Sequence, residues 1–172
     1  MLVLETPRLR LRWYTPADAA FILKLLNEPS WIANIGQRNV RTLDEAETWI
    51  RERLIGNYEK QGFGFWAAER KSDDLLIGMC GLVKRDTLPA VDLGYAFLPA
   101  YWGQGYAREG AAACLDYARK ELGLRRVLAI TGPENLASSR VLEAIGMHHE
   151  DTRVLDGEER ATRVFAWEAS SP

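Results

Sequence analysis

A short glycine-rich stretch, Trp102-Gly103-Gln104-Gly105-Tyr106-Ala107, lies between a predicted strand and a predicted helix. The first N–H groups of a helix have no partner inside the helix, and the helix dipole is positive at that end. Small residues at positions 103, 105 and 107 let an anion approach the backbone without meeting a side chain. The stretch therefore predicts a phosphate site, and the alternative is a tight turn that binds nothing.

This turn differs from two common phosphate-binding motifs. No Gly-Lys-Ser/Thr follows it, so it is not a P-loop. The strand before it is preceded by strands rather than by a helix, and no acidic residue closes the next strand, residues 124–131. These features exclude the dinucleotide-binding fingerprint.

The elements around the turn predict one α/β domain over residues 1–172. Alternating or continuous apolar residues indicate strands, and apolar residues at helical spacing indicate helices. The expected strands are residues 8–13, 63–68, 75–83, 90–98 and 124–131, and two more that flank the Asp156-Gly157 turn. One expected helix begins at Thr15-Pro16 and ends at Pro29. A second begins at the capping box of Thr42 and runs to about Lys60. Two more span residues 107–122 and 135–146.

Composition bounds the class of protein. The chain has 172 residues, 47% of them hydrophobic and 27% charged, and a formal net charge of -2, which offers no broad footprint for nucleic acid. We see no secretory leader and no apolar run of membrane-spanning length, so we expect a cytoplasmic protein that binds no membrane. Cys80 and Cys114 lack zinc spacing, and the adjacent His148 and His149 would point to opposite faces of a strand, so we expect no metal.

Three segments together carry a family resemblance: Asp92–Tyr95, Pro99–Glu109 and Asn135–Met147. In order and spacing they resemble the GNAT acetyltransferase superfamily, and most closely its branch of ribosomal-protein alanine and serine N-acetyltransferases. The opening residues 5–12, Glu-Thr-Pro-Arg-Leu-Arg-Leu-Arg, are similar to the usual start of that branch. The resemblance covers nearly the whole chain.

The resemblance implies a mixed, mostly antiparallel seven-stranded sheet with about four helices on its two faces. Its central parallel strands, residues 90–98 and 124–131, would splay apart and hold acetyl-CoA between them. The backbone of Phe97 and Leu98 would face the pantetheine arm and the thioester. The residues implied for the pyrophosphate are Gly103, Gln104, Gly105, Tyr106 and Ala107.

The implied reaction is direct attack of a primary amine on acetyl-CoA in a ternary complex. It needs a neutral amine, a polarised carbonyl and a proton for the leaving thiolate. At pH 7 an α-amine is roughly 14% neutral and a lysine only ~0.04%. An α-amine acceptor, such as a protein N-terminus, therefore makes a light demand on a base, although a small-molecule amine is equally open.

Asp92 is the candidate base, and its alternative is an exposed strand carboxylate paired with an arginine. Leu142 occupies the position where many family members carry a tyrosine acid. Ser138 resembles the serine that takes this role in the ribosomal branch and that also contacts the coenzyme, or it is only a small residue in a first helical turn. Asn135 would bond to the pantetheine arm or simply cap its helix.

The acceptor site is expected between the helical N-terminal segment and the last hairpin. The candidate lining residues are Trp31, Asn34, Arg38 and Trp66, with burial in the core as the alternative. Because of Leu142, a catalytically silent acyl-CoA-binding module remains the alternative to an enzyme, and a plain nucleotide-binding protein is a third possibility. The expected assembly is a monomer or a homodimer.

Overall fold

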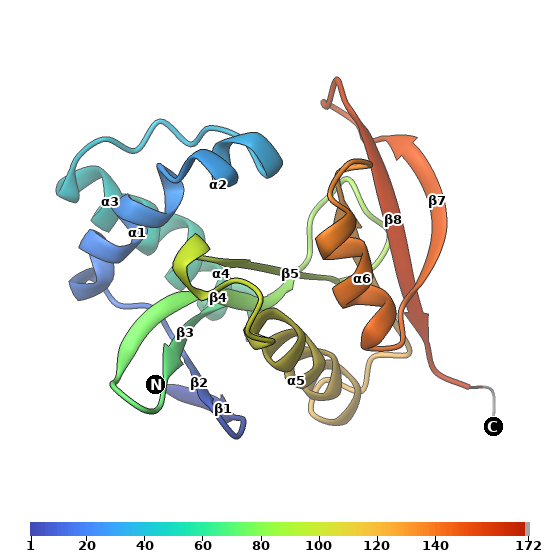
Figure 1. The fold of residues 1–172 in the computed structure, drawn as a ribbon, viewed down its shortest axis with the longest axis horizontal. Helices are drawn as coiled ribbons and strands as arrows, with labels where there is room; N and C mark the ends of the chain where they lie inside the picture. Colours follow the sequence, from blue (N-terminus) through green and yellow to red (C-terminus); the bar gives the residue numbers. More distant parts are fainter. Residues whose placement is uncertain (171–172) are drawn as a thin grey trace.

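One mixed sheet of eight strands runs through the molecule in the order β1-β2-β3-β4-β5-β6-β8-β7 (Figure 1). The computed structural model describes residues 1–170. The strands are β1 Leu2–Glu5, β2 Leu9–Arg12, β3 Phe65–Arg70, β4 Leu75–Val83, β5 Asp92–Phe97, β6 Arg126–Thr131, β7 His148–Val154 and β8 Ala161–Glu168. Neighbouring strands are antiparallel, except for β5 and β6, which are parallel. The expected mixed sheet with one parallel pair is confirmed, with eight strands instead of seven.

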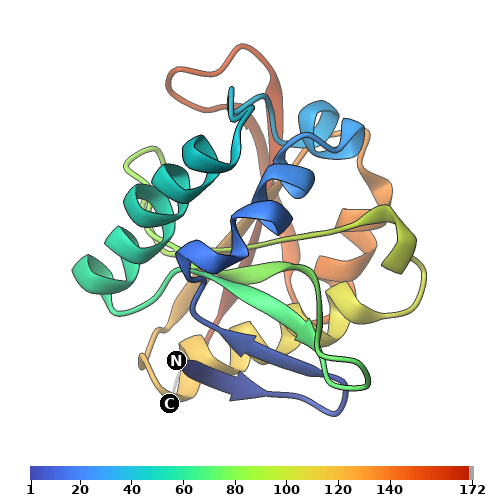
Figure 2. The ribbon, with the colours of Figure 1, turned by 90° about the vertical axis from the view of Figure 1, so that its left-hand side faces the viewer.

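Helices cover both faces of this sheet (Figures 1 and 2). One face carries α1 Ala19–Leu26, α2 Pro29–Asn34 and a continuous helical segment made of α3 Leu43–Trp49, a π-helical stretch Ile50–Ile55 and α4 Gly56–Gln61. The other face carries α5 Tyr106–Lys120 and α6 Leu136–Ala144. No helix within residues 1–170 is both long and apolar enough to cross a membrane.

Two elements differ from the expectation. β1 pairs with β2 at the sheet edge, Leu4 opposite Leu11, yet its four residues are at most half-buried and show no alternation. Pro29 begins α2 and does not end α1, which stops at Leu26. Proline fits the first position of a helix because the N–H it lacks would have no partner there.

Side chains along β3 point alternately to the two faces of the sheet, and this alternation decides which helices each of them contacts. Trp66 packs edge-on against Tyr117 of α5, with ring centroids 5.1 Å apart. Cys80, opposite Trp66 on β4, meets Cys114 of α5 with their Sγ atoms 3.4 Å apart, as free thiols. Phe65 must therefore point to the other face, since successive strand residues alternate.

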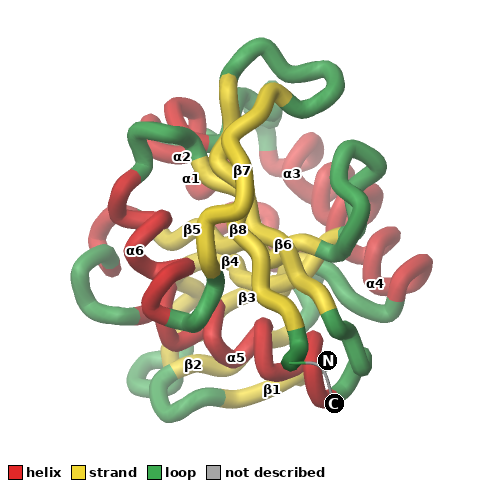
Figure 3. The backbone as a smooth tube through the Cα atoms, turned by 90° about the vertical axis from the view of Figure 1, so that its right-hand side faces the viewer, coloured by secondary structure: helices red, strands yellow, loops and turns green. Residues whose placement is uncertain are grey.

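At the far edge of the sheet, β8 lies between β6 and β7 (Figure 3).

Thr42 begins α3 with the expected capping box. Its hydroxyl accepts from the N–H of Glu45 at 3.2 Å, and the Glu45 carboxylate accepts from the N–H of Thr42 at 3.1 Å. We expect Thr42→Ala to lower the free energy of urea unfolding by about 1 kcal/mol, because the N–H of Glu45 loses its hydroxyl acceptor.

Thr48→Ala is the matched control on the same helix. Its exposed hydroxyl only donates to the carbonyl of Asp44, which the helix already uses. We expect a change of no more than about 0.5 kcal/mol. Equal losses in the two variants would contradict the capping role of Thr42.

Candidate active site

The parallel strands β5 and β6 separate soon after they meet. They pair only where Asp92 lies opposite Leu128 and Leu93 opposite Ala129. Beyond that point β5 stays paired with β4 as far as Phe97, and β6 stays paired with β8 as far as Thr131. The carboxyl ends of the two strands therefore border a wedge that no other strand among residues 1–170 fills.

Main-chain hydrogen bonds determine which groups of β5 face this wedge. The N–H of Leu98 donates to the carbonyl of Ile77 at 2.9 Å, on the β4 side. Because antiparallel residues alternate, the N–H and C=O of Phe97 point the other way, toward the wedge. The Phe97 carbonyl accepts from Trp102 Nε1 at 2.8 Å, so the Phe97 N–H is the main-chain group that is left to face the wedge. The Leu98 carbonyl accepts from the N–H of Tyr101, so both main-chain groups of Leu98 are engaged.

The glycine-rich turn lies directly after β5 and starts α5. Gly103 and Gly105 have φ of 72° and 83°, values that favour glycine. A Cβ at Gly103 would meet no atom within 4 Å, so its backbone angle, and not crowding, requires the glycine. Within residues 1–170, no main-chain N–H from 103 to 107 donates a hydrogen bond. These amides and the helix dipole have the arrangement that an anion at the mouth of the wedge would need.

Two hydroxyl groups meet beside the wedge. Tyr95 Oη lies 2.8 Å from Ser138 Oγ and 3.2 Å from the Ser138 carbonyl. Burial raises the pKa of Tyr95 to about 12, so it keeps its proton at neutral pH. Asn135 caps α6 by accepting from the N–H of Ser138 at 3.2 Å. The cap is therefore formed, and a bond from the Asn135 amide to the pantetheine arm stays a prediction.

Asp92 is fully buried and held by Arg85. Arg85 Nε and Nη2 donate to the two carboxylate oxygens at 2.8 and 2.9 Å. Burial raises the pKa of Asp92, and the guanidinium opposes that rise. The arginine partner matches the structural alternative, although that alternative expected an exposed carboxylate. Each carboxylate oxygen keeps a second acceptor position, but the side chain is fully buried, so Asp92 can act as a base only if the structure around it opens.

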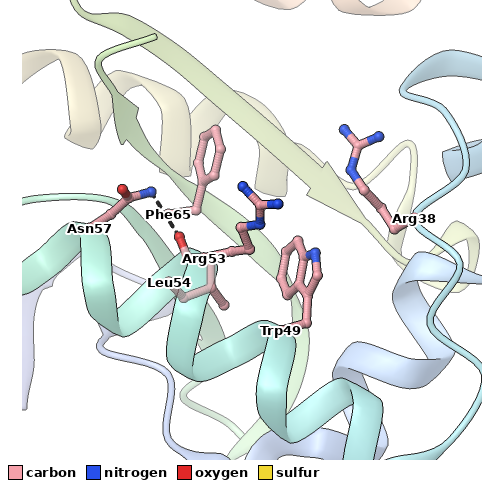
Figure 4. A pocket seen from close by; sticks show the side chains of 6 residues that line it. All are labelled: Arg38, Trp49, Arg53, Leu54, Asn57 and Phe65. Carbon is pink, nitrogen blue, oxygen red and sulfur yellow. Dashed lines mark hydrogen bonds between the residues drawn. The ribbon is translucent and has the colours of Figure 1, made fainter.

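A cavity of about 480 Å³ lies on the helical face that α3 and α4 cover (Figure 4). Its lining residues are Arg38, Trp49, Arg53, Leu54, Asn57 and Phe65. A Cβ on Gly94 of β5 would lie 2.8 Å from the Phe65 ring, so this ring lies between the cavity and the strand that forms the wedge. It lies on the face of the sheet opposite α5.

Of the four residues expected to contact the acceptor, the cavity includes only Arg38. Trp66 is 1% exposed and faces α5, because the strand parity brings Phe65 to the cavity instead. Trp31 is the residue of α2 that is buried in the core. Asn34 is exposed and donates to the Ser30 carbonyl of its own helix at 3.0 Å. Trp49 and Arg53, which the sequence did not single out, take their places.

A family model of the GNAT acetyltransferase domain matches residues 8–148. This chain belongs to the GNAT acetyltransferases. It is 36% identical over 153 residues to YkkB of Bacillus subtilis, an uncharacterised protein, and the match covers 87% of each chain.

Two solved structures of known acetyltransferases share the fold. RimL, a ribosomal L7/L12 α-N-protein acetyltransferase in complex with coenzyme A, matches with a TM-score of 0.82 at 15% identity over 98% of each chain. Spermidine N-acetyltransferase of Vibrio cholerae, in complex with coenzyme A and spermine, matches with a TM-score of 0.78 at 20% identity over 95% of this chain and 96% of its own.

Arg8 connects the N-terminus of this GNAT acetyltransferase to the turn, a role that the sequence did not indicate. Arg8 Nη1 donates to the Gln104 carbonyl at 2.8 Å, and its guanidinium lies over the Tyr106 ring, 4.2 Å from the centroid. Arg8 Nε donates to Glu109 at 2.7 Å. Burial alone would raise the pKa of Glu109, but hydrogen bonds from Thr6 and Arg8 lower it. The expected strand over residues 8–13 included Arg8, which lies just before β2.

We expect Arg8→Gln to weaken coenzyme A binding roughly tenfold, because an unanchored turn loses the arrangement of its amides, at a cost of about 1.4 kcal/mol. Isothermal titration with coenzyme A measures the change. Arg10→Gln is the control, since Arg10 also binds carboxylates, Glu69 and Asp74, but away from the turn. The role of Arg8 is disproved if both variants bind coenzyme A as the wild type does.

Proposed function

We propose that this acetyltransferase, as one domain over residues 1–172, moves an acetyl group from acetyl-CoA to a primary amine by direct attack in a ternary complex. One observation carries the proposal. The wedge between β5 and β6 has unpartnered amides of the turn at its mouth, and the Phe65 ring, which lies close to Gly94 of β5, lines a cavity on the opposite face. Donor and acceptor could therefore approach the same strand end from two sides.

Main-chain groups would hold the donor. The amides of Gly103, Gln104, Gly105, Tyr106 and Ala107 would bind its pyrophosphate. The N–H of Phe97 would donate to the thioester oxygen and stabilise the negative charge that develops there. We assign this contact to Phe97 and not to Leu98, because both main-chain groups of Leu98 are bonded within the chain. The free amide of Asn135 would bond to the pantetheine arm.

Ser138 and Tyr95 would supply the proton for the leaving group. The amine nitrogen bonds to the carbonyl carbon, the carbon–sulfur bond breaks, and the sulfur takes a proton from Ser138 Oγ. The Tyr95 hydroxyl, 2.8 Å away, can donate to Ser138 Oγ as charge develops on it. The proton that the new amide nitrogen loses returns to this pair through solvent or Asp92.

Leu142 favours the second candidate, a silent acyl-CoA-binding module, since it replaces a tyrosine of many relatives. The Tyr95 hydroxyl reaches Ser138 from β5 instead and weakens that argument. A screen of primary amines, read as free thiol released from acetyl-CoA, tests the choice. We expect amine-dependent thiol release; binding of acetyl-CoA without release for any amine would favour the silent module.

We expect Ser138→Ala to lower kcat about 100-fold, because general acid catalysis typically contributes at least this much. Tyr95→Phe should lower kcat roughly tenfold, through the loss of one hydrogen bond to a developing charge. The KM for acetyl-CoA should change little in either variant. Tyr117→Phe is the control, since Tyr117 packs on Trp66 through its ring. A wild-type kcat in Ser138→Ala would exclude this proton donor.

The pH profile of kcat/KM tests Asp92 as the base. A base must be deprotonated, so the rate falls as pH falls through its pKa. Arg85→Gln removes the cation that limits the pKa of Asp92, so we expect the acidic limb to move to higher pH. Asp92→Asn should abolish that limb and leave only the titration of the acceptor amine. A limb that is identical in all three proteins would show that Asp92 has a structural role alone.

A further inference from the structure

The cavity lined by Phe65 carries two positive charges that form no salt bridge within residues 1–170. The side chains of Arg38 and Arg53 both line it, from the segment after α2 and from the π-helical stretch (Figure 4). Among residues 1–170, no carboxylate oxygen lies within 4.0 Å of either guanidinium. Arg8, Arg10, Arg12, Arg70, Arg85 and Arg126 have such partners. Other arginines of the described residues, such as Arg41 and Arg140, have none, so what distinguishes Arg38 and Arg53 is that they line one cavity together.

The neighbouring charges do not neutralise this pair. Desolvation lowers the pKa of Arg38, and the positive charges of Arg85 and Arg53 lower it further, while Glu158 of the β7–β8 turn opposes them. Arg85 is itself neutralised by Asp92. Arginine stays protonated in proteins, so repulsion between Arg38 and Arg53 persists until an anion relieves it.

The position of the cavity separates it from the coenzyme's phosphates. The unpartnered amides of the turn begin α5, and α5 packs on the face that Trp66 and Cys80 share. Phe65 lines the cavity from the opposite face and touches Gly94 of β5. The two arginines therefore face whatever approaches the wedge from the acceptor side.

The cavity also has apolar walls. Trp49, Leu54 and Phe65 line it together with the two arginines and Asn57. A guanidinium binds a carboxylate through two parallel N–H···O bonds. A cationic amine as the ligand cannot form these bonds, because it offers no acceptor oxygens to the guanidinium. Polyamines such as the spermine bound by the Vibrio cholerae enzyme would bring further positive charge to this cavity.

We propose that the acceptor of this acetyltransferase is a primary amine that also carries a carboxylate, which Arg38 and Arg53 bind while Trp49 and Phe65 pack against its apolar part. The inference rests on the proposed function, because it assigns the cavity to the acceptor. The carboxylate belongs either to a small amino acid or to an acidic side chain close to a peptide N-terminus.

Matched acceptors that differ only in the charged group test this inference. One arm compares leucine with leucine amide, which lacks the carboxylate, and the other compares Ala-Glu amide with Ala-Gln amide; spermine is the cationic comparison. We expect kcat/KM at least tenfold higher for the carboxylate member in one arm, and that arm identifies the source. Equal values within both arms, or a preference for spermine, would overturn the inference while acetyl transfer itself stands.

The arginine variants locate the effect. Arg53→Gln and Arg38→Gln should each reduce the preference for the carboxylate member about tenfold, with KM for acetyl-CoA unchanged. Arg51→Gln is the control, since Arg51 is exposed two residues earlier and pairs with Glu47 at 4.0 Å. If Arg53→Gln lowers both members of a pair equally, the guanidinium does not bind the carboxylate.

A binding measurement separates this inference from the proposed function. Calorimetric titration of the same four acceptors into protein saturated with coenzyme A reads the preference without turnover. A carboxylate preference that is lost in Arg53→Gln supports the inference even if no amine is acetylated, a result that would overturn only the enzymatic assignment. Turnover of amines with no such preference in binding or kinetics would overturn the inference alone.

Discussion

Main-chain pairing between β5 and β6 ends after two residue pairs, and this early end determines what the rest of the site must do. Buried N–H and C=O groups need partners, so a central strand that loses its neighbour is costly unless something else bonds to it. The chain meets part of this need itself, since Trp102 donates to the Phe97 carbonyl. The remaining Phe97 N–H is a donor in a sheltered place, where a carbonyl is its natural partner.

The same separation divides the charge of the molecule between two faces. The turn before α5 attracts anions through unpartnered amides and the helix dipole, and Arg8 strengthens that side. On the other face, Arg38 and Arg53 form a second positive region. A formal net charge of -2 conceals both, because the acidic residues lie elsewhere or are paired. Local charge, and not net charge, is what selects ligands here.

Local sequence signals predicted the elements well where one residue type has one structural meaning. The capping box at Thr42 and the turn at Asp156-Gly157 were found where expected. Pro29 was ambiguous, since proline both ends and begins helices, and β1 has no alternation to detect. The Trp66 side chain points to the α5 face, although it was expected on the acceptor side. A strand that helices cover on both faces is apolar throughout, so its sequence does not show which side chains point to which face.

The site was less predictable because its contacts join residues far apart in the chain. Arg8 and Glu109 are separated by 101 positions, and Tyr95 and Ser138 by 43. The family resemblance indicated only that Leu142, which is buried in the core, stands where many members carry a tyrosine. The fold supplies a phenol from β5 to the same helix. The Tyr95 hydroxyl is held by the sheet that also positions Phe97, so the hydroxyl proposed to relay a proton to Ser138 and the N–H proposed to bind the carbonyl share one rigid element. The loss of a helix tyrosine is therefore not in itself a loss of proton transfer, because what the chemistry requires is a hydroxyl at that point in space.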